Sequence, residues 1–265
     1  MDMEAYKTLD TTKTIKTYIN KLSPKERLNL LKTNPVKYIQ RIKHPTKEEQ
    51  ETAINLNERC LRHIDNSNTE ILLYAIQNNP YAIEYMSNPC LEVQLTAVQR
   101  NGCCVNCIAN PCLEVQLAAV QQNGIAIVYI KDPSVEVQLA AVQQNGIAIV
   151  HIKDPSVEVQ LAAIENNYKS IKFIKNKNEE LTAACITGIE AKYAAGNFSN
   201  YDIDDTENII NHYINYTCLS KETKMRILYI CITLNLISSI DNIFTKKYIS
   251  YYDLDDPTKI LLELL

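Results

Sequence analysis

The chain of 265 residues contains no tryptophan and only five glycines. A turn-rich β protein uses many more glycines, so this composition argues against one. The sequence also lacks an apolar run of the roughly 18 residues that span a bilayer. The longest candidate, residues 227–237, is interrupted by Thr233 and Asn235. The acidic residues near the N-terminus do not form the basic-then-apolar pattern of a signal peptide. We therefore expect a protein of one or two domains without a membrane span.

An excess of positive charge is lacking as well. The chain carries 27 Lys and Arg against 31 Asp and Glu, a net charge of −4, with a pI of about 5.7. A protein that wraps nucleic acid by bulk charge needs the opposite balance. Nucleic acid is therefore not the expected partner.

Cysteine is plentiful, and its nine copies are an odd number. Without a signal peptide, the expectation is free thiols in a reducing, cytoplasmic environment. Asn, Ile, Lys and Tyr are abundant, and their AT-rich codons indicate an AT-rich genome.

An internal repeat dominates the sequence. Residues 110–124 read NPCLEVQLAAVQQNG, and residues 132–146 read DPSVEVQLAAVQQNG. Related copies begin at Asn88 and Asp154, so that the prolines that follow recur every 22 residues. Extending this step predicts seven copies over residues 44–198, preceded by a degenerate copy over residues 23–43. A fixed period of this length is typical of stacked helical repeats.

Each copy reads as two short helices. In the copy that begins at Asp132, we expect Asp132 as the N-cap and Pro133 at the first helical position. A helix of about ten residues follows over 135–144, with Val135, Leu139 and Val142 on one apolar face. Val137 and Ala141 flank this face, so the apolar arc is wide. Asn145 and Gly146 end it, because both residue types tolerate left-handed backbone conformations. Residues 147–153 form the second helix. Neither helix folds alone, so stacked copies must share one core.

Aligned positions of the first helix form columns of polar residues. The glutamate column complements the helix dipole and is expected to serve the fold rather than a partner. The glutamine and asparagine columns are expected to be partly buried and hydrogen-bonded to backbone, at the turns of neighbouring copies. The columns are Glu48, Glu70, Glu92, Glu114, Glu136, Glu158 and Glu180; Gln50, Gln94, Gln116, Gln138 and Gln160; and Asn57, Asn79, Asn101, Asn123, Asn145 and Asn167.

The second helix has a small column, two apolar columns, a variable column and a column rich in rings. The small residues are Cys60, Ala82, Cys104, Ala126, Ala148 and Ser170, which predicts close packing. The variable column, expected to face solvent, holds Arg62, Glu84, Asn106, Val128, Val150 and Lys172. We call the fifth set the ring column: His63, Tyr85, Cys107, Tyr129, His151 and Phe173.

The ring column supplies the candidate binding residues, Tyr85, Tyr129, His151, His63 and Phe173. Tyr and His combine an apolar body with a polar tip, a combination that is enriched in interface hot spots. The column also changes from copy to copy, as a surface matched to an irregular partner would. The alternative is a core column whose rings fill space between copies.

Two stretches of these copies resemble known repeats. LAAVQQNGIAIVYI, residues 117–130, is similar to short helical repeats of unknown function in some protist, bacterial and giant-virus proteins, which read roughly LAAVKQNGLALEYA. DPSVEVQLAA, residues 132–141, resembles HEAT-like and leucine-rich-variant repeats, in which D-P-x-x-E-V-R-x-A-A is common. Gln138 stands where those repeats have Arg, which removes a charged ladder. The resemblance implies a right-handed α-solenoid used for binding, with no catalytic residues.

The expected fold is therefore all-α: an α-solenoid of about eight short two-helix repeats with N- and C-terminal helical caps. The domains are residues 1–43, an N-terminal cap with the degenerate repeat; residues 44–198, the repeats; and residues 199–265, a C-terminal cap or small helical domain. A polar boundary is expected over residues 197–205. Expected cap helices are 14–22, 24–31, 207–217, 221–239, 242–252 and 257–265.

The sequence does not predict a metal-binding or catalytic site. Cys90, Cys103, Cys104, Cys107 and Cys112 lie close in sequence and include a CxxC, but they replace Ser, Ala and ring residues of other copies. We therefore expect plain thiols rather than a zinc site. Asp202, Asp204, Asp205 and Glu207 lack the spacing of an EF-hand, so a solvated loop is expected. No nucleophile–base pair or phosphate-binding motif is present, and neither enzymatic activity, a metal nor a cofactor is expected.

The sequence predicts a protein–protein interaction scaffold that binds along its repeats; in a virus or parasite the partner would be a host factor. One alternative is a nucleic-acid-binding HEAT-like module, for which Lys131, Lys153 and Lys175 form only a short basic column. The other is a structural subunit of a larger assembly, with residues 260–265 as an oligomer contact.

Overall fold

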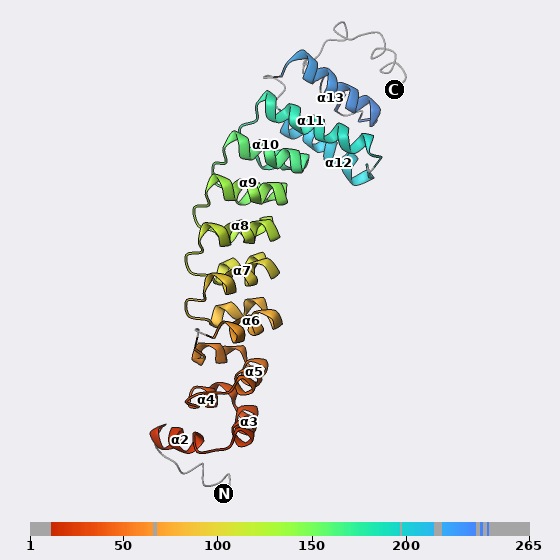
Figure 1. Cartoon of the computed structure of the whole chain (residues 1–265). Coiled ribbons are helices and arrows are strands. Elements are labelled where there is room, and N and C mark those ends of the chain that lie inside the picture. The colour runs from red at the N-terminus through yellow and green to blue at the C-terminus, as the bar shows by residue number, and fades with distance from the viewer. Residues whose placement is uncertain are drawn as a thin grey trace. The chain divides into compact units, whose positions relative to one another are not determined.

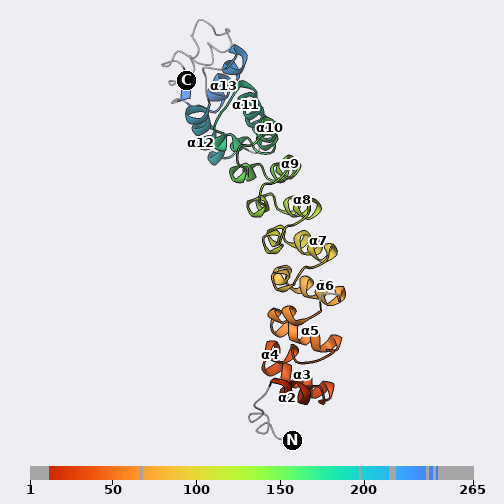
Figure 2. The same cartoon turned by 90° about the vertical axis from the view of Figure 1, so that its left-hand side faces the viewer.

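The computed structural model describes residues 12–65, 68–196, 198–214, 219–236, 239, 240 and 243. These residues form helices, and none of them lies in a strand. The chain divides into two compact units, residues 1–122 and 123–265. Inside each unit, consecutive long helices lie side by side (Figure 1), and the short helices form a second row beside them (Figure 2).

The described residues of the first unit form seven α-helices and three 3-10 helices. They are α2 (Thr12–Ile19), α3 (Pro24–Thr33), α4 (Pro35–Ile39), α5 (Lys47–Leu56), η1 (Glu58–His63), α6 (Thr69–Asn78), η2 (Pro80–Tyr85), α7 (Leu91–Arg100), η3 (Gly102–Cys107) and α8 (Leu113–Gln122).

The second unit begins with the same alternation and ends in longer helices. Its elements are η4 (Gly124–Tyr129), α9 (Val135–Gln144), η5 (Gly146–His151), α10 (Val157–Asn166), η6 (Tyr168–Phe173), α11 (Glu179–Ala194), α12 (Asn200–Asn208), the π-helix η7 (Ile209–Tyr213) and α13 (Lys221–Thr233).

The long helix of the repeat has the predicted bounds, but its N-cap was wrongly predicted. Ser134, not Asp132, caps α9, and its hydroxyl accepts a hydrogen bond from the backbone N–H of Val137. Asp132 instead adopts a left-handed backbone conformation with φ of 48°, as Asn88, Asn110 and Asp154 do at equivalent positions. Asn and Asp tolerate that conformation better than other non-glycine residues, which accounts for their place before each proline.

The end of the long helix also differs from the prediction. Asn145 is extended, with φ of −150°, and its side chain caps the next helix by accepting the N–H of Ile147. Gly146 is required by close packing: a Cβ there would lie 2.4 Å from the carbonyl oxygen of Ala163. The second helix, expected over 147–153, is a 3-10 helix that ends at His151.

The fully buried residues of α9 include the two that were expected to flank its apolar face. Val137, Ala141 and Val142 are fully buried, whereas Val135 is 48% exposed. In the short helices, each member of the small column is fully buried, which confirms its close packing. The variable column is exposed as expected at Arg62, Glu84, Asn106, Val128 and Val150, and half-buried at Lys172.

Side-chain amides hold the turns together. The Gln138 side chain is half-buried and donates to the carbonyl oxygen of Pro133 at 2.9 Å, and the rest of its column makes the same bond. Burial and backbone bonding are thus confirmed, but the acceptor lies in the same copy rather than in a neighbour.

Side chains also join neighbouring copies. The Asn79 amide, from the asparagine column, donates to the Glu58 carboxylate of the preceding copy at 2.9 Å. Outside the columns, the Gln144 side chain accepts the N–H of Gly124, and that of Asn166 accepts the N–H of Gly146, each at 2.7 Å.

The degenerate N-terminal copy keeps the pattern in outline. Ser23 caps α3 in a capping box with Glu26, and Asn34 joins α3 to the short α4. The expected helices at 14–22 and 24–31 are observed as α2, which begins and ends earlier, and as α3, which ends two residues later.

The seventh copy does not form two helices. Ile189 occupies the position of the helix-ending Asn, so α11 continues for 16 residues. A helix, α12, begins at Asn200 inside the expected polar boundary, so α12 with η7 starts seven residues before the expected helix 207–217. Residues 215–217 of that expected helix lie outside the described residues. Helix α13 ends at Thr233, short of the expected 239. Of the expected helices at 242–252 and 257–265, all residues but Ile243 lie outside the described residues.

Candidate binding surface

The ring column lies at the surface for most of its length. Tyr129 is 46% exposed and Phe173 44%, and His63 and His151 are also exposed. Tyr85 is half-buried, with the guanidinium of Arg62 placed 5.2 Å from its ring centre. The alternative of a core column is therefore wrong for the exposed members.

The 3-10 geometry of the short helices turns these side chains outward. Residues three apart in such a helix lie on one face. Ile127 and Ile130 are separated by one such turn, and both are buried. Val128 and Tyr129 lie off that row, and both are exposed. The same arrangement recurs at Val150 and His151, so the second unit presents neighbouring exposed pairs on η4 and η5, which pack against each other.

The cysteines have the surroundings of ordinary thiols. Cys90 and Cys112 are exposed, Cys103 and Cys107 are half-buried, and Cys104 is buried. Burial first, and the neighbouring thiols Cys107 and Cys103 second, raise the pKa of Cys104 to about 12. Across the residues that the structure describes, no three His, Cys, Asp or Glu side chains come together as a metal site requires.

The sequence predicted that the acidic cluster is a solvated loop, and this prediction was wrong. It lies on α12, where Asp202 is buried and forms ion pairs with Lys192 and Lys169. Asp205 accepts hydrogen bonds from Lys169, at 2.6 Å, and from Lys172. Bonds from Lys192, and then from Ser199, hold the pKa of Asp202 well below its usual range. These contacts fasten α12 to α11 and η6.

A capping pattern in the sequence, Ser199 followed three residues later by Asp202, marks the start of α12. The Ser199 hydroxyl accepts the N–H of Asp202, and the Asp202 carboxylate accepts the N–H of Ser199 in return. The S-x-x-D pattern is a variant of the capping box. The lysines that neutralise Asp202 lie 10 and 33 residues away in the sequence and carry no such signal.

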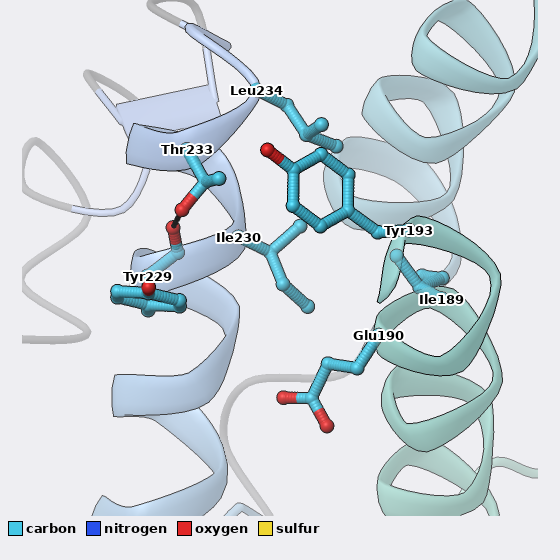
Figure 3. Close-up of a pocket in the computed structure, with 7 residues that line it drawn as sticks. All are labelled: Ile189, Glu190, Tyr193, Tyr229, Ile230, Thr233 and Leu234. Carbon is cyan, nitrogen blue, oxygen red and sulfur yellow. Dashed lines mark hydrogen bonds between the residues drawn. The ribbon is translucent and has the colours of Figure 1, made fainter. Parts of the chain in front are cut away.

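An apolar groove between α11 and α13 was not foreseen. It has a free volume of about 240 Å³ and is lined mainly by Ile189, Tyr193, Tyr229, Ile230 and Leu234. Figure 3 shows the Tyr193 ring directed from α11 toward Ile230 on α13 and Leu234, the residue that follows that helix. The one carboxylate in its lining, Glu190, is neutralised by Arg226. Among the described residues that line it, the groove offers apolar surface and tyrosine hydroxyls but no uncompensated charge.

No described helix is long and apolar enough to cross a membrane. No protein-family model, curated protein or solved structure matches the chain.

Proposed function

We propose that the repeats stack into an α-solenoid with helical caps, and that the protein is a non-enzymatic scaffold that binds another protein along the repeat surface. The observation that carries this proposal is the exposure of the ring column. Its neighbours Ile127, Ile149 and Ile171 are buried and serve the core, whereas Tyr129, His151 and Phe173 are held on short, well-capped helices with their rings open to solvent.

The physical basis is the low entropic penalty of binding through such side chains. Tyr, His and Phe have two rotatable side-chain bonds each, so they lose little conformational freedom when a partner covers them. Their backbone is already fixed by the asparagine caps of η4, η5 and η6. A rigid row of half-exposed rings is therefore suited to anchoring a protein partner.

Affinity capture from the native source, followed by mass spectrometry, tests the proposal. The wild-type chain is compared with the double variant Tyr129→Ala, His151→Ala and with Tyr229→Ala, which removes a ring that is 57% exposed on α13, outside the ring column. We expect a protein captured by the wild type and by Tyr229→Ala to be lost from the double variant. The same captured set from all three chains would contradict the proposal.

The nucleic-acid alternative is separated by a filter-binding measurement over a salt series. Lys131, Lys153 and Lys175 are exposed, and the first two are followed directly by the exposed carboxylates of Asp132 and Asp154. We expect only weak retention of duplex DNA, abolished by moderate salt. Tight, salt-resistant binding would favour the alternative.

A further inference from the structure

The second unit carries a second exposed apolar column beside the ring column. Val135 and Val157 are the first residues of α9 and α10, and they are 48% and 47% exposed. The chain reaches Val135 from Tyr129 through a turn of five residues, 130–134, so the end of η4 and the start of α9 lie at the same edge. In Figure 1, the turns that precede α10 and α11 lie on one side of this unit. We call this surface the turn edge: Val128, Tyr129, Val135, Val150, His151 and Val157.

The fold itself does not require apolar residues at the turn edge. Lys47 and Thr69 occupy the position of Val135 in other copies, at the first residue of α5 and α6. Glu84 and Arg62 occupy the position of Val128, in η2 and η1, and both are exposed. Copies with polar residues at these positions form the same helices. The exposed half of each valine adds nothing to folding, but it contributes free energy when a partner covers it.

Acidic groups outnumber basic groups along the turn edge. Each turn and helix start presents one exposed ammonium and two exposed carboxylates: Lys131, Asp132 and Glu136 in one copy, and Lys153, Asp154 and Glu158 in the next. None of these six groups forms a salt bridge with the part of the chain that the structure describes. Charge complementarity therefore favours a partner with basic side chains flanking an apolar stripe.

The spacing of the copies selects a helical partner. Helices α9 and α10 pack against each other, and packed helices lie about 8–10 Å apart. An α-helix returns to the same face after seven residues, a rise of about 10.5 Å, which nearly matches one copy. A β-strand repeats a face at about 6.7 or 13.4 Å, and neither distance matches the spacing of one copy, so an extended peptide fits the turn edge less well.

We propose that the turn edge binds a basic amphipathic α-helix of another protein, with apolar side chains against the valines and Lys or Arg side chains against Glu136 and Glu158. This inference rests on the proposed function and specifies the chemistry of its partner. The ring column supplies the anchors. Glu136 and Glu158 belong to the glutamate column that complements the helix dipoles, and their exposed carboxylates have the second role of orienting the bound helix along the edge.

A synthetic helix provides the probe. It has 21 residues in three heptads, with Leu at two core positions of each heptad and Lys at the flanking positions; a matched peptide carries Glu in place of Lys. Binding of each labelled peptide to the full chain is measured by fluorescence anisotropy. We expect the Lys peptide to bind at least about tenfold more tightly than the Glu peptide, a difference of about 1.4 kcal/mol. Equal or reversed affinity would overturn the inference.

Two pairs of variants locate the binding surface. Glu136→Gln with Glu158→Gln, and separately Val135→Ser with Val157→Ser, should each weaken the Lys peptide at least about fivefold. The control, Glu165→Gln with Asp204→Asn, removes the same charge from exposed positions away from the edge and should leave binding unchanged. An equal loss of affinity for the Lys peptide in the edge and control variants would show that the peptide is attracted only by the net negative charge of the chain. That result would overturn the inference.

Other occupants give other outcomes. A dimer in sedimentation equilibrium that Val135→Ser with Val157→Ser abolishes would identify a second copy of the chain and overturn the inference. Failure of the helix-binding inference can be distinguished from failure of the proposed function. Unselective peptides, together with capture lost in the ring-column variant, would leave the proposed function standing. Selective peptide binding at the edge, together with unchanged capture, would contradict the ring column as the anchor.

Discussion

At the scale of single residues, one asparagine and one glycine shape each repeat. Asn145 ends α9 with its backbone and begins η5 with its side chain, so one residue caps two helices. Gly146 then lets η5 approach the backbone of α10 more closely than a Cβ would permit. Where this pair is replaced by Ile189 and Glu190, the helix continues without a break.

Replacing Asn145 by Leu should destabilise the protein. The change removes the acceptor for the N–H of Ile147 at a half-buried site, and loss of such a cap costs about 0.5–2 kcal/mol. Urea unfolding followed by circular dichroism measures the effect, with the exposed neighbour change Gln143→Leu as control. An unchanged midpoint for Asn145→Leu would show that the cap contributes nothing to stability.

Replacing Ala148 by Leu should also destabilise. Ala148 is fully buried and belongs to a column that holds only Ala, Cys or Ser, so a larger side chain overpacks the site at a cost of about 1–3 kcal/mol. Val150→Leu, two residues away and exposed, is the matched control. Equal stability of the two variants in the same urea titration would contradict the close packing of η5.

At the scale of elements, the repeat made some features predictable from sequence and hid others. The bounds of α9 were predictable because four near-identical copies share them. The 3-10 character of η5 was not, because over six residues periods of 3.0 and 3.6 place the apolar residues on nearly the same face. Asp132 was predicted as the N-cap because Asp is a preferred residue type at that position. Its left-handed backbone conformation could not be predicted from the sequence.

The C-terminal elements were harder to predict because long-range pairs position them. The carboxylates of α12 look like a solvated loop until Lys169 and Lys192 are placed beside them. The groove between α11 and α13 likewise joins segments about 40 residues apart in the sequence, with no repeat to align them.

The attachment of α12 should weaken in acid. The lowered pKa values of Asp202 and Asp205 mean that their charged forms stabilise the folded state. That stability is complete above the ordinary Asp pKa of about 4 and is lost as pH falls through the lowered values.

Asp202→Asn isolates this effect. At pH 7 it should cost about 1.5–3 kcal/mol, since it removes charge-assisted hydrogen bonds from a buried carboxylate. The difference in melting temperature from the wild type should shrink as the pH is lowered from 7 toward 2. A constant difference over that range would contradict the ionised state of Asp202 in the folded protein.

At the scale of the whole molecule, the proposed solenoid implies that stability depends on neighbour contacts. Copies with a neighbour on both sides should open least. Native-state hydrogen exchange should therefore show the strongest protection in residues 89–165, the most regular copies. Strongest protection in residues 206–265 would instead make the C-terminal helices an independent and more stable domain.

The central claim is that the fold does not depend on the ring column, which is therefore free to bind. The melting temperature of the double variant Tyr129→Ala, His151→Ala tests it most directly. Because both side chains are exposed, we expect a shift of less than about 2 °C, less than a loss of 1 kcal/mol produces in a chain of this size. A fall of about 4 °C or more would show that the rings support the core, and would contradict the claim.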